Sequence, residues 1–154
     1  MPKIDIAKVP LDTATRYPKP HDQAVAGRAR QRLGNAAGLD QFGVNLCRLA
    51  PGAASSLRHW HMNEDEFVYV LEGEVVLIED DGETILKPGD AAAWKAGASN
   101  GHCLVNRSQS DVLMLEVGTR APSENAFYSD IDMQVVRDEK SARYSKKNGE
   151  PYPQ

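Results

Sequence analysis

The sequence PGAASSLRHWHMNEDEFVYVLEG, residues 51–73, contains the pattern on which the fold assignment depends. A Pro-Gly turn leads to His59 and His61, and after four intervening residues Glu66 opens a β-rich run. Side chains alternate between the two faces of a strand, so His59 and His61 point the same way and Trp60 points the other way. The four intervening residues suffice for a turn. The stretch therefore predicts two strands that place two imidazoles and a carboxylate side by side.

The residues around this stretch also predict β-structure. Short runs rich in β-branched and aromatic residues are separated by turn residues such as Asp80-Asp81-Gly82, and no helical period lies between them. Strands at this spacing indicate an all-β antiparallel sandwich or barrel. The predicted strands cover residues 42–49, 67–71, 75–79, 84–86, 102–106 and 112–117.

The 154 residues suit one domain with three zones. We expect an irregular, proline-containing N-terminal arm over residues 1–35, a β-barrel over residues 36–120, and a polar tail over residues 121–154 that holds one further strand at residues 132–136.

The arm contains an undecided segment at residues 24–33. It suits either a short helix or an edge strand, because Arg28, Arg30 and Arg32 alternate. We expect these arginines to form a solvated face, and an anion clamp is the alternative.

Composition limits the partners and the compartment. The net charge of −4 has no basic stripe, which argues against a nucleic-acid partner. The N-terminus lacks the apolar core of a signal peptide, and no apolar run is long enough for a membrane span. We expect a cytoplasmic protein in which Cys47 and Cys103 are reduced, buried residues.

The ligand types of the histidine stretch predict a metal site. Two imidazoles and a carboxylate on the inside of a barrel are costly to bury unless something pairs them. Neutral imidazole and carboxylate are ligands of divalent transition metals. His59, His61 and Glu66 are therefore the predicted ligands, and the metal is Zn, Fe, Mn or Ni.

The spacing Gly52-x6-His59-x-His61-x4-Glu66-x6-Gly73 resembles the first motif of the cupin superfamily. The second motif of that family resembles Gly89-Asp90, then Lys95-Ala96-Gly97, then His102-x3-Asn106, with lysine in place of the usual proline. The resemblance covers residues 40–120 and implies a double-stranded β-helix, or jelly-roll, barrel with a three-histidine, one-carboxylate metal site.

The fourth ligand has two candidates within that resemblance. Two extra residues separate Gly97 from His102, so Asn100 falls at the usual distance from the glycine. Counting back from Asn106 selects His102, which we prefer because it completes the ligand set. Asn100 is then a supporting group or a substrate contact. Glu64 and Asp65 are expected to be solvated.

The residues Phe42-Gly43-Val44-Asn45-Leu46 before the first motif and Asn100-Gly101-His102 in the second resemble those of a bacterial subgroup of single-domain cupins. Some members of this subgroup are labelled sugar-phosphate isomerase-like. The resemblance implies an enzyme that acts on a small oxygen-rich metabolite, such as a sugar phosphate or keto acid, by isomerase or lyase chemistry, with Glu66 as the catalytic proton acceptor. The alternatives are a non-catalytic sensor that binds a metal and a small ligand, and an iron-dependent dioxygenase. We also expect a homodimer in which the arm crosses to the partner's sheet, because sheet edges are commonly covered by another chain.

Overall fold

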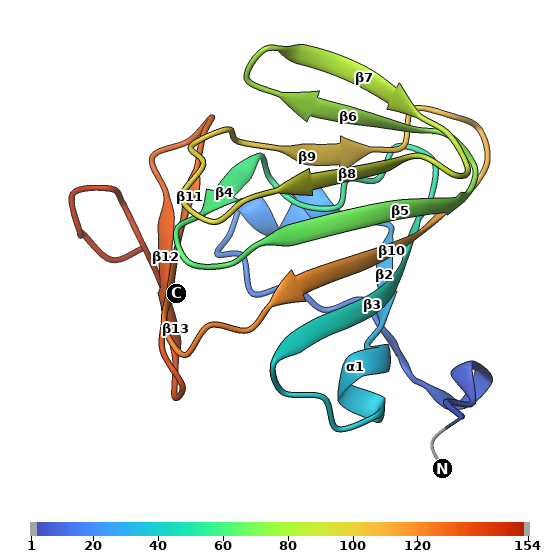
Figure 1. Ribbon diagram of the computed structural model, residues 1–154. Coiled ribbons are helices and arrows are strands. Elements are labelled where there is room, and N and C mark those ends of the chain that lie inside the picture. The colour runs from blue at the N-terminus through green and yellow to red at the C-terminus, as the bar shows by residue number, and fades with distance from the viewer. Residues whose placement is uncertain (1–2, 153–154) are drawn as a thin grey trace.

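The structure is a computed structural model that describes residues 3–152. Within this range most of the regular secondary structure is β-strand, as predicted (Figure 1). Short helices lie only in the first quarter of the chain: η1 (Ile6–Lys8), η2 (His21–Val25) and α1 (Leu33–Ala36). The strands are β1 (Leu11–Asp12), β2 (Arg28–Gln31), β3 (Phe42–Leu49), β4 (His59–His61), β5 (Glu66–Glu72), β6 (Val75–Glu79), β7 (Gly82–Leu86), β8 (Ala91–Trp94), β9 (Cys103–Val105), β10 (Val112–Thr119), β11 (Glu124–Tyr128), β12 (Gln134–Arg137) and β13 (Ala142–Ser145).

Three antiparallel sheets form the barrel. The largest has the strand order β1-β2-β3-β10-β5-β8, the second β13-β12-β11-β4 and the third β7-β6-β9. An isolated bridge between His59 and His102 joins the edge of β4 to the residue before β9. The barrel is therefore closed where two of the predicted site residues meet.

The undecided segment of the arm is a strand. Arg28–Gln31 pairs with β3, and β1 pairs with the outer edge of β2, so both extend the main sheet. Arg28 and Arg30 lie opposite the buried residues Leu49 and Cys47 of β3. The arginines therefore face inward, and the prediction of a solvated face is wrong for Arg28, which is only 8% exposed.

The C-terminal zone contains more β-structure than predicted. The expected strand at residues 132–136 overlaps β12, and β11 and β13 pair with β12 on either side. Strand β11 also pairs with β4, so this zone is built into the wall that carries the histidines. β8 was also not predicted, because its three alanines have little intrinsic preference for a strand.

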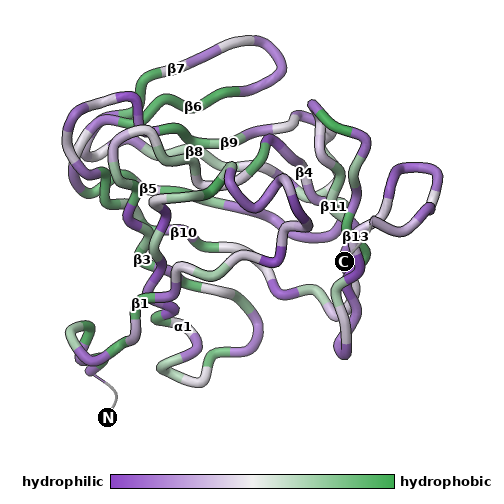
Figure 2. Tube along the Cα trace, turned by 180° about the vertical axis from the view of Figure 1, so that it is seen from behind, coloured by the Kyte–Doolittle hydropathy of each residue, from purple (hydrophilic) through white to green (hydrophobic). Residues whose placement is uncertain are grey.

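Strand parity divides the barrel interior into an apolar half and a polar half. On β5, Val68 and Val70 are buried, and Glu66 continues their row toward one end. On β10, Val112 and Met114 are buried, and Glu116 continues that row in the same direction. The polar ends of the rows thus meet at one end of the barrel, while the other end is filled by hydrophobic side chains. In Figure 2, hydrophobic residues (green) recur along these strands, and hydrophilic residues (purple) are common in the loops.

Turn geometry fixes the end of the histidine stretch. Gly73 has φ +79°, and a Cβ at this position would lie 2.6 Å from the carbonyl oxygen of Asp111. Only glycine fits between β5 and β6 here.

Cys47 and Cys103 are both buried and free, as predicted. No helix among residues 3–152 is long and apolar enough to cross a membrane.

The outward face of the main sheet carries a patch of exposed apolar side chains. Phe67, Tyr69 and Leu71 of β5 are 37–40% exposed and point away from the barrel interior, beside the small outward residues of β8. An exposed apolar patch of this kind is typical of an interface. In this chain the arm lies on its own sheet, so its crossing to a partner stays a prediction.

We predict that light scattering will give a mass about twice the 16.9 kDa of one chain. Tyr69→Asp should shift this mass toward that of a monomer, because a charge would be buried at the interface. Ile85→Asp, on the separate β7 strand, should not. A monomeric wild-type protein at micromolar concentration would contradict the prediction.

Candidate metal centre and cavity

The two histidines of β4 face each other inside the barrel. Their Nε2 atoms are 3.0 Å apart, and both side chains are less than one-fifth exposed. Trp60 lies on the opposite face, where its ring stacks on Phe127 of β11 with centroids 4.7 Å apart. The predicted parity of this strand is therefore confirmed.

Glu66 lies between the two imidazoles, at the start of β5. Its carboxylate oxygens are 3.8 Å from Nε2 of His59 and 3.6 Å from Nε2 of His61. One donor atom from each of the three residues lies within 4.8 Å of the other two. This spacing is close enough for one ion to contact all three.

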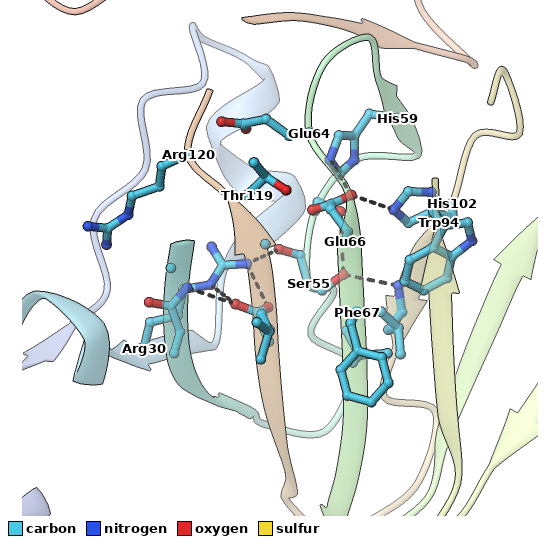
Figure 3. A pocket seen from close by; sticks show the side chains of 18 of the residues that line it. Arg30, Ser55, His59, Glu64, Glu66, Phe67, Trp94, His102, Thr119 and Arg120 are labelled. Carbon is cyan, nitrogen blue, oxygen red and sulfur yellow. Dashed lines mark hydrogen bonds and ion pairs between the residues drawn. The ribbon is translucent and has the colours of Figure 1, made fainter. Parts of the chain in front are cut away.

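His102 completes this group, which we call the histidine cluster: His59, His61, Glu66 and His102. The Nε2 atom of His102 is 2.8 Å from Oε2 of Glu66, and its ring stacks on Trp94 with centroids 3.8 Å apart. Its backbone exchanges two hydrogen bonds with that of His59. His102 therefore faces His59 and Glu66 from the residue before β9, as Figure 3 shows.

The neighbours of His102 fix its position and show where Asn100 lies. A Cβ at Gly101 would come within 1.8 Å of Oγ of Ser129, so only glycine allows this close approach. The Asn100 side chain donates to Glu79 at 3.0 Å and accepts from the backbone N–H of Asp80. It is engaged with the β6–β7 hairpin rather than with the histidine cluster.

The orientation of the imidazoles tests whether a metal fits. Nδ1 of His59 lies 2.9 Å from the carbonyl oxygen of Leu57, and Nδ1 of His102 lies 3.3 Å from that of Asn100. Carbonyl oxygens only accept, so both Nδ1 atoms are assigned as N–H donors. The Nε2 lone pairs of both rings then point at the cluster.

The contact between His102 and Glu66 depends on which ring nitrogen of His102 carries the proton. Nε2 of a neutral His102 that donates from Nδ1 presents a lone pair to a carboxylate oxygen 2.8 Å away, which is repulsive. The other tautomer donates from Nε2 to Glu66 and leaves a lone pair of Nδ1 facing the carbonyl oxygen of Asn100 at 3.3 Å. A cation bound at Nε2 would satisfy both contacts. The residues present thus fit a divalent metal.

His61 is oriented by carboxylates. Its buried Nδ1 has no hydrogen-bond partner within ordinary distance among the described residues, and its nearest acceptors are Glu124 at 3.6 Å and Glu64 at 3.8 Å. Glu124 is 4% exposed and accepts the backbone N–H groups of Met62 and Asn63, so its carboxylate is held in place. A metal-binding imidazole usually donates its other ring N–H to a carboxylate, and Glu124 is the carboxylate placed to accept it here.

The pKa values of His59 and Glu66 suit metal binding. Burial lowers the pKa of His59 to about 4, so the ring is neutral at physiological pH. Burial alone would raise the pKa of Glu66, but the hydrogen bond with His102 and the neighbouring imidazoles lower it to about 2. A neutral imidazole beside an ionised carboxylate is the state that binds a metal.

Glu64 is mostly buried, so the prediction that it is solvated is wrong. Its side chain is only 12% exposed, and it pairs with Arg137 and accepts the backbone N–H of Ala121 at 2.9 Å. Burial raises the pKa of this carboxyl group. Asp65 is exposed as expected.

A second group of possible ligands is formed by His61, Glu64 and Glu124, whose donor atoms also lie within 4.8 Å of one another. Here Arg137 compensates the charge of Glu64, and two backbone N–H groups occupy Glu124. Hydrogen bonds within the protein thus already satisfy both carboxylates. No sequence motif predicted that Glu124 lies beside the histidine cluster, because it follows Met62, whose N–H it accepts, by 62 residues along the chain.

The histidine cluster opens into a cavity of about 550 Å³, a size typical of small-molecule sites. The cavity runs from His59, Glu66 and His102 to the inward face of β2 and β10 (Figure 3). Its wall also carries six arginines: Arg16, Arg28, Arg30, Arg32, Arg120 and Arg137. The sequence interpretation preferred a solvated face for Arg28, Arg30 and Arg32 and kept an anion clamp as the alternative.

Arg30 forms a mostly buried ion pair with Glu116 across the cavity wall. The guanidinium donates to both carboxylate oxygens, at 2.6 and 2.8 Å, and Asn45 lies 3.4 Å from the same carboxylate. Burial alone would raise the pKa of Glu116, but the charge and hydrogen bonds of Arg30 lower it below its usual value of 4.5.

The barrel and its histidine cluster match a known family. Residues 45–118 match a family model described as a cupin domain. The chain superposes with a TM-score of 0.96 on a sugar phosphate isomerase from a cupin superfamily of Silicibacter pomeroyi, with 49% identity, covering 99% of this chain and 97% of that one. The chain belongs to the cupin superfamily.

Other similar structures agree with the cupin fold. A protein of Acidithiobacillus ferrooxidans, provisionally described as a sugar phosphate isomerase, is 25% identical and superposes with a TM-score of 0.75, covering 82% of this cupin and 81% of that chain. A polyketide cyclase of Streptomyces resistomycificus shares the fold at 21% identity, with a TM-score of 0.67, covering 84% of this chain and 88% of that one. No functionally curated protein matches this cupin.

We predict that Glu116→Gln will lower the free energy of unfolding by roughly 2–4 kcal/mol at pH 7, because it leaves the Arg30 guanidinium without its carboxylate. Glu116 has a lowered pKa in the fold, so its contribution is present above pH 4.5 and is lost as the pH falls toward the folded value. The difference between wild type and variant should therefore shrink in acid.

Denaturant unfolding between pH 7 and pH 3 measures this difference. Glu83→Gln is the control, because Glu83 forms an exposed ion pair with Arg107 and its loss should change stability little. A gap between wild type and Glu116→Gln that is independent of pH would contradict the prediction.

Proposed function

We propose that this cupin is a metal-dependent isomerase that acts on a small phosphorylated sugar. The observation that carries the proposal is the convergence of three imidazole Nε2 atoms on the Glu66 carboxylate, at 2.8–3.8 Å, which suits one bound cation. The site opens onto a cavity large enough for a small metabolite. The names of the similar proteins of S. pomeroyi and A. ferrooxidans support the reaction class.

The four residues of the histidine cluster would hold the ion, which is Zn, Fe, Mn or Ni by the chemistry of its ligands. When bound, such an ion polarises a carbonyl oxygen and makes the neighbouring C–H more acidic. The carbonyl contacts of His59 and His102 fix the ring orientations, and Glu124 is placed to fix that of His61. Catalysis by this site depends on that preorganisation.

Isomerisation of an aldose to a ketose moves one proton from C2 to C1 and a second from the C2 hydroxyl to the carbonyl oxygen, and it needs no oxidant or reductant. Glu66 is assigned as the proton acceptor because it is the most exposed member of the cluster, at 30%, and it lines the cavity. Glu64 lies on the same wall, but Arg137 and the N–H of Ala121 occupy its Oε1 atom. The reaction requires Glu66 to accept the proton and return it to the adjacent carbon.

We predict about one equivalent of a divalent first-row metal per chain, measured by elemental analysis after purification or after titration. Replacement of His59 and His61 together by alanine should abolish binding, and His102→Ala or Glu66→Ala should weaken it, because each removes a donor atom. Asp65→Ala removes a neighbouring carboxylate outside the cluster and should retain the metal. Failure of the wild-type protein to take up any of the four metals would refute the proposed site.

Turnover is tested by incubating sugar phosphates with the metal-loaded protein in D₂O. The expected result is conversion between aldose and ketose with deuterium incorporated at the carbon next to the carbonyl, detected by NMR. Glu66→Gln should reduce the rate by at least about a hundredfold, the usual loss when an acid–base group is removed. Metal-dependent binding without conversion of any sugar phosphate would instead favour a sensor.

A further inference from the structure

The cavity beside the histidine cluster has an excess of positive charge in a protein whose net charge is −4. Six arginines line it, against three glutamates: Glu64, Glu66 and Glu116. Arg32 is paired with Asp12, which lies outside the cavity lining, and this leaves an excess of two positive charges. A concave wall of one sign concentrates ligands of the opposite sign.

Arg28 is the most buried arginine that contributes to this excess. It is only 8% exposed, and its guanidinium donates to the carbonyl oxygens of Ser55 at 2.7 Å and Ala14 at 3.4 Å. No carboxylate among residues 3–152 lies within ion-pair distance of it. A buried charge without a counter-ion is costly, so its presence at a cavity wall indicates that an anion pairs with it when bound.

Arg30 brings a second guanidinium to the same place. Its Nη2 atom lies 3.2 Å from the Ser55 carbonyl oxygen that also accepts from Arg28, so the two guanidinium groups converge on one atom. Figure 3 shows Arg30 and Ser55 on the side of the pocket that faces Glu66. Glu116 compensates the charge of Arg30 through its Nε and Nη2 atoms, so the uncompensated charge of the two arginines is that of Arg28.

We propose that Arg28 and Arg30 form the subsite for the phosphate group of the substrate, with the exposed Arg16 as a further contact at the same wall. This inference rests on the proposed function and assigns the orientation of the substrate: the phosphate binds at β2, and the carbonyl end points to the histidine cluster. Planar guanidinium groups bind phosphate oxygens in pairs, and a doubly charged anion balances the excess of two. A single carboxylate does not.

The proposal separates the anion subsite from the metal centre. Arg28 and Arg30 lie on β2, and none of their hydrogen bonds involves a member of the histidine cluster. Phosphate should therefore bind to protein from which metal has been removed. Failure of the metal or of turnover would leave this expectation unaffected, so the two proposals are tested independently.

The experiment is calorimetric titration of full-length, metal-stripped protein with inorganic phosphate at low ionic strength. We expect saturable binding at one site that weakens as salt is added. Arg28→Met should weaken it at least about tenfold, as expected for the loss of charge-assisted hydrogen bonds. The matched control is Arg48→Met, which removes an arginine from the outward face of β3, where it pairs with Asp111, and should leave binding unchanged.

Thermal unfolding distinguishes a binding role from a structural one. Arg28→Met replaces an uncompensated buried charge by an apolar side chain of similar length, so its melting temperature without phosphate should equal or exceed that of wild type. Phosphate should raise the melting temperature of wild type but not that of the variant. Arg28→Lys retains the charge without the planar fork, and should fold and bind phosphate more weakly than wild type.

Three results would overturn the proposal. The first is absence of phosphate binding by the metal-free wild type, and the second is unchanged binding by both Arg28→Met and Arg28→Lys. The third is tighter binding of a dicarboxylate such as malonate than of phosphate, which would assign the subsite to a different anion.

Discussion

Three imidazole rings converge on one carboxylate inside the barrel, and the surrounding structure is arranged to hold them there. His59 and His61 come from one strand, Glu66 begins the next, and His102 reaches them through a backbone bridge to His59. Burial keeps His59 neutral, while Glu66 stays ionised among the rings. Such a group is expensive to bury without a cation. The close packing at Gly101, the stacking of Trp94 on His102 and the fixed carboxylate of Glu124 hold the residues of this group in place.

The same strand parity that places the cluster also creates the cavity. The inward rows of β5 and β10 begin as hydrophobic core and end in Glu66 and Glu116. The inward row of β2 adds Arg28 and Arg30 to the polar end. The hydrophobic half stabilises the barrel, and the polar half carries charges that only partly neutralise one another. One end of a small barrel thus carries the histidine cluster on one wall and the paired arginines of β2 on another, within a single cavity.

The local pattern of the sequence was sufficient to predict the strands with strong β-propensity and the ligands that share a strand or a turn. The period of two placed His59, His61 and Glu66 correctly and turned Trp60 away. The side chains that depend on distant pairing were not predictable in this way. Glu124 reaches His61 only because β11 pairs with β4, and β11 has no strong strand pattern. Arg28 and Arg30 seemed solvated because their burial depends on where β2 docks on β3.

Glu64 shows the same limitation over a short distance. Its position in a turn predicted exposure, but the C-terminal strands cover that turn and supply Arg137 as its partner. Sequence spacing could not reveal this contact between residues 73 positions apart. Charged residues near a predicted metal site are therefore best assigned after the pairing of the strands is known.

The most direct test of the metal centre is anomalous diffraction from crystals of the metal-loaded protein, recorded at the absorption edge of the bound metal. We predict one strong peak within bonding distance of Nε2 of His59, His61 and His102 and of a carboxylate oxygen of Glu66. A peak between Nδ1 of His61, Glu64 and Glu124, or no peak in the barrel after soaking with Zn, Fe, Mn or Ni, would contradict the assignment.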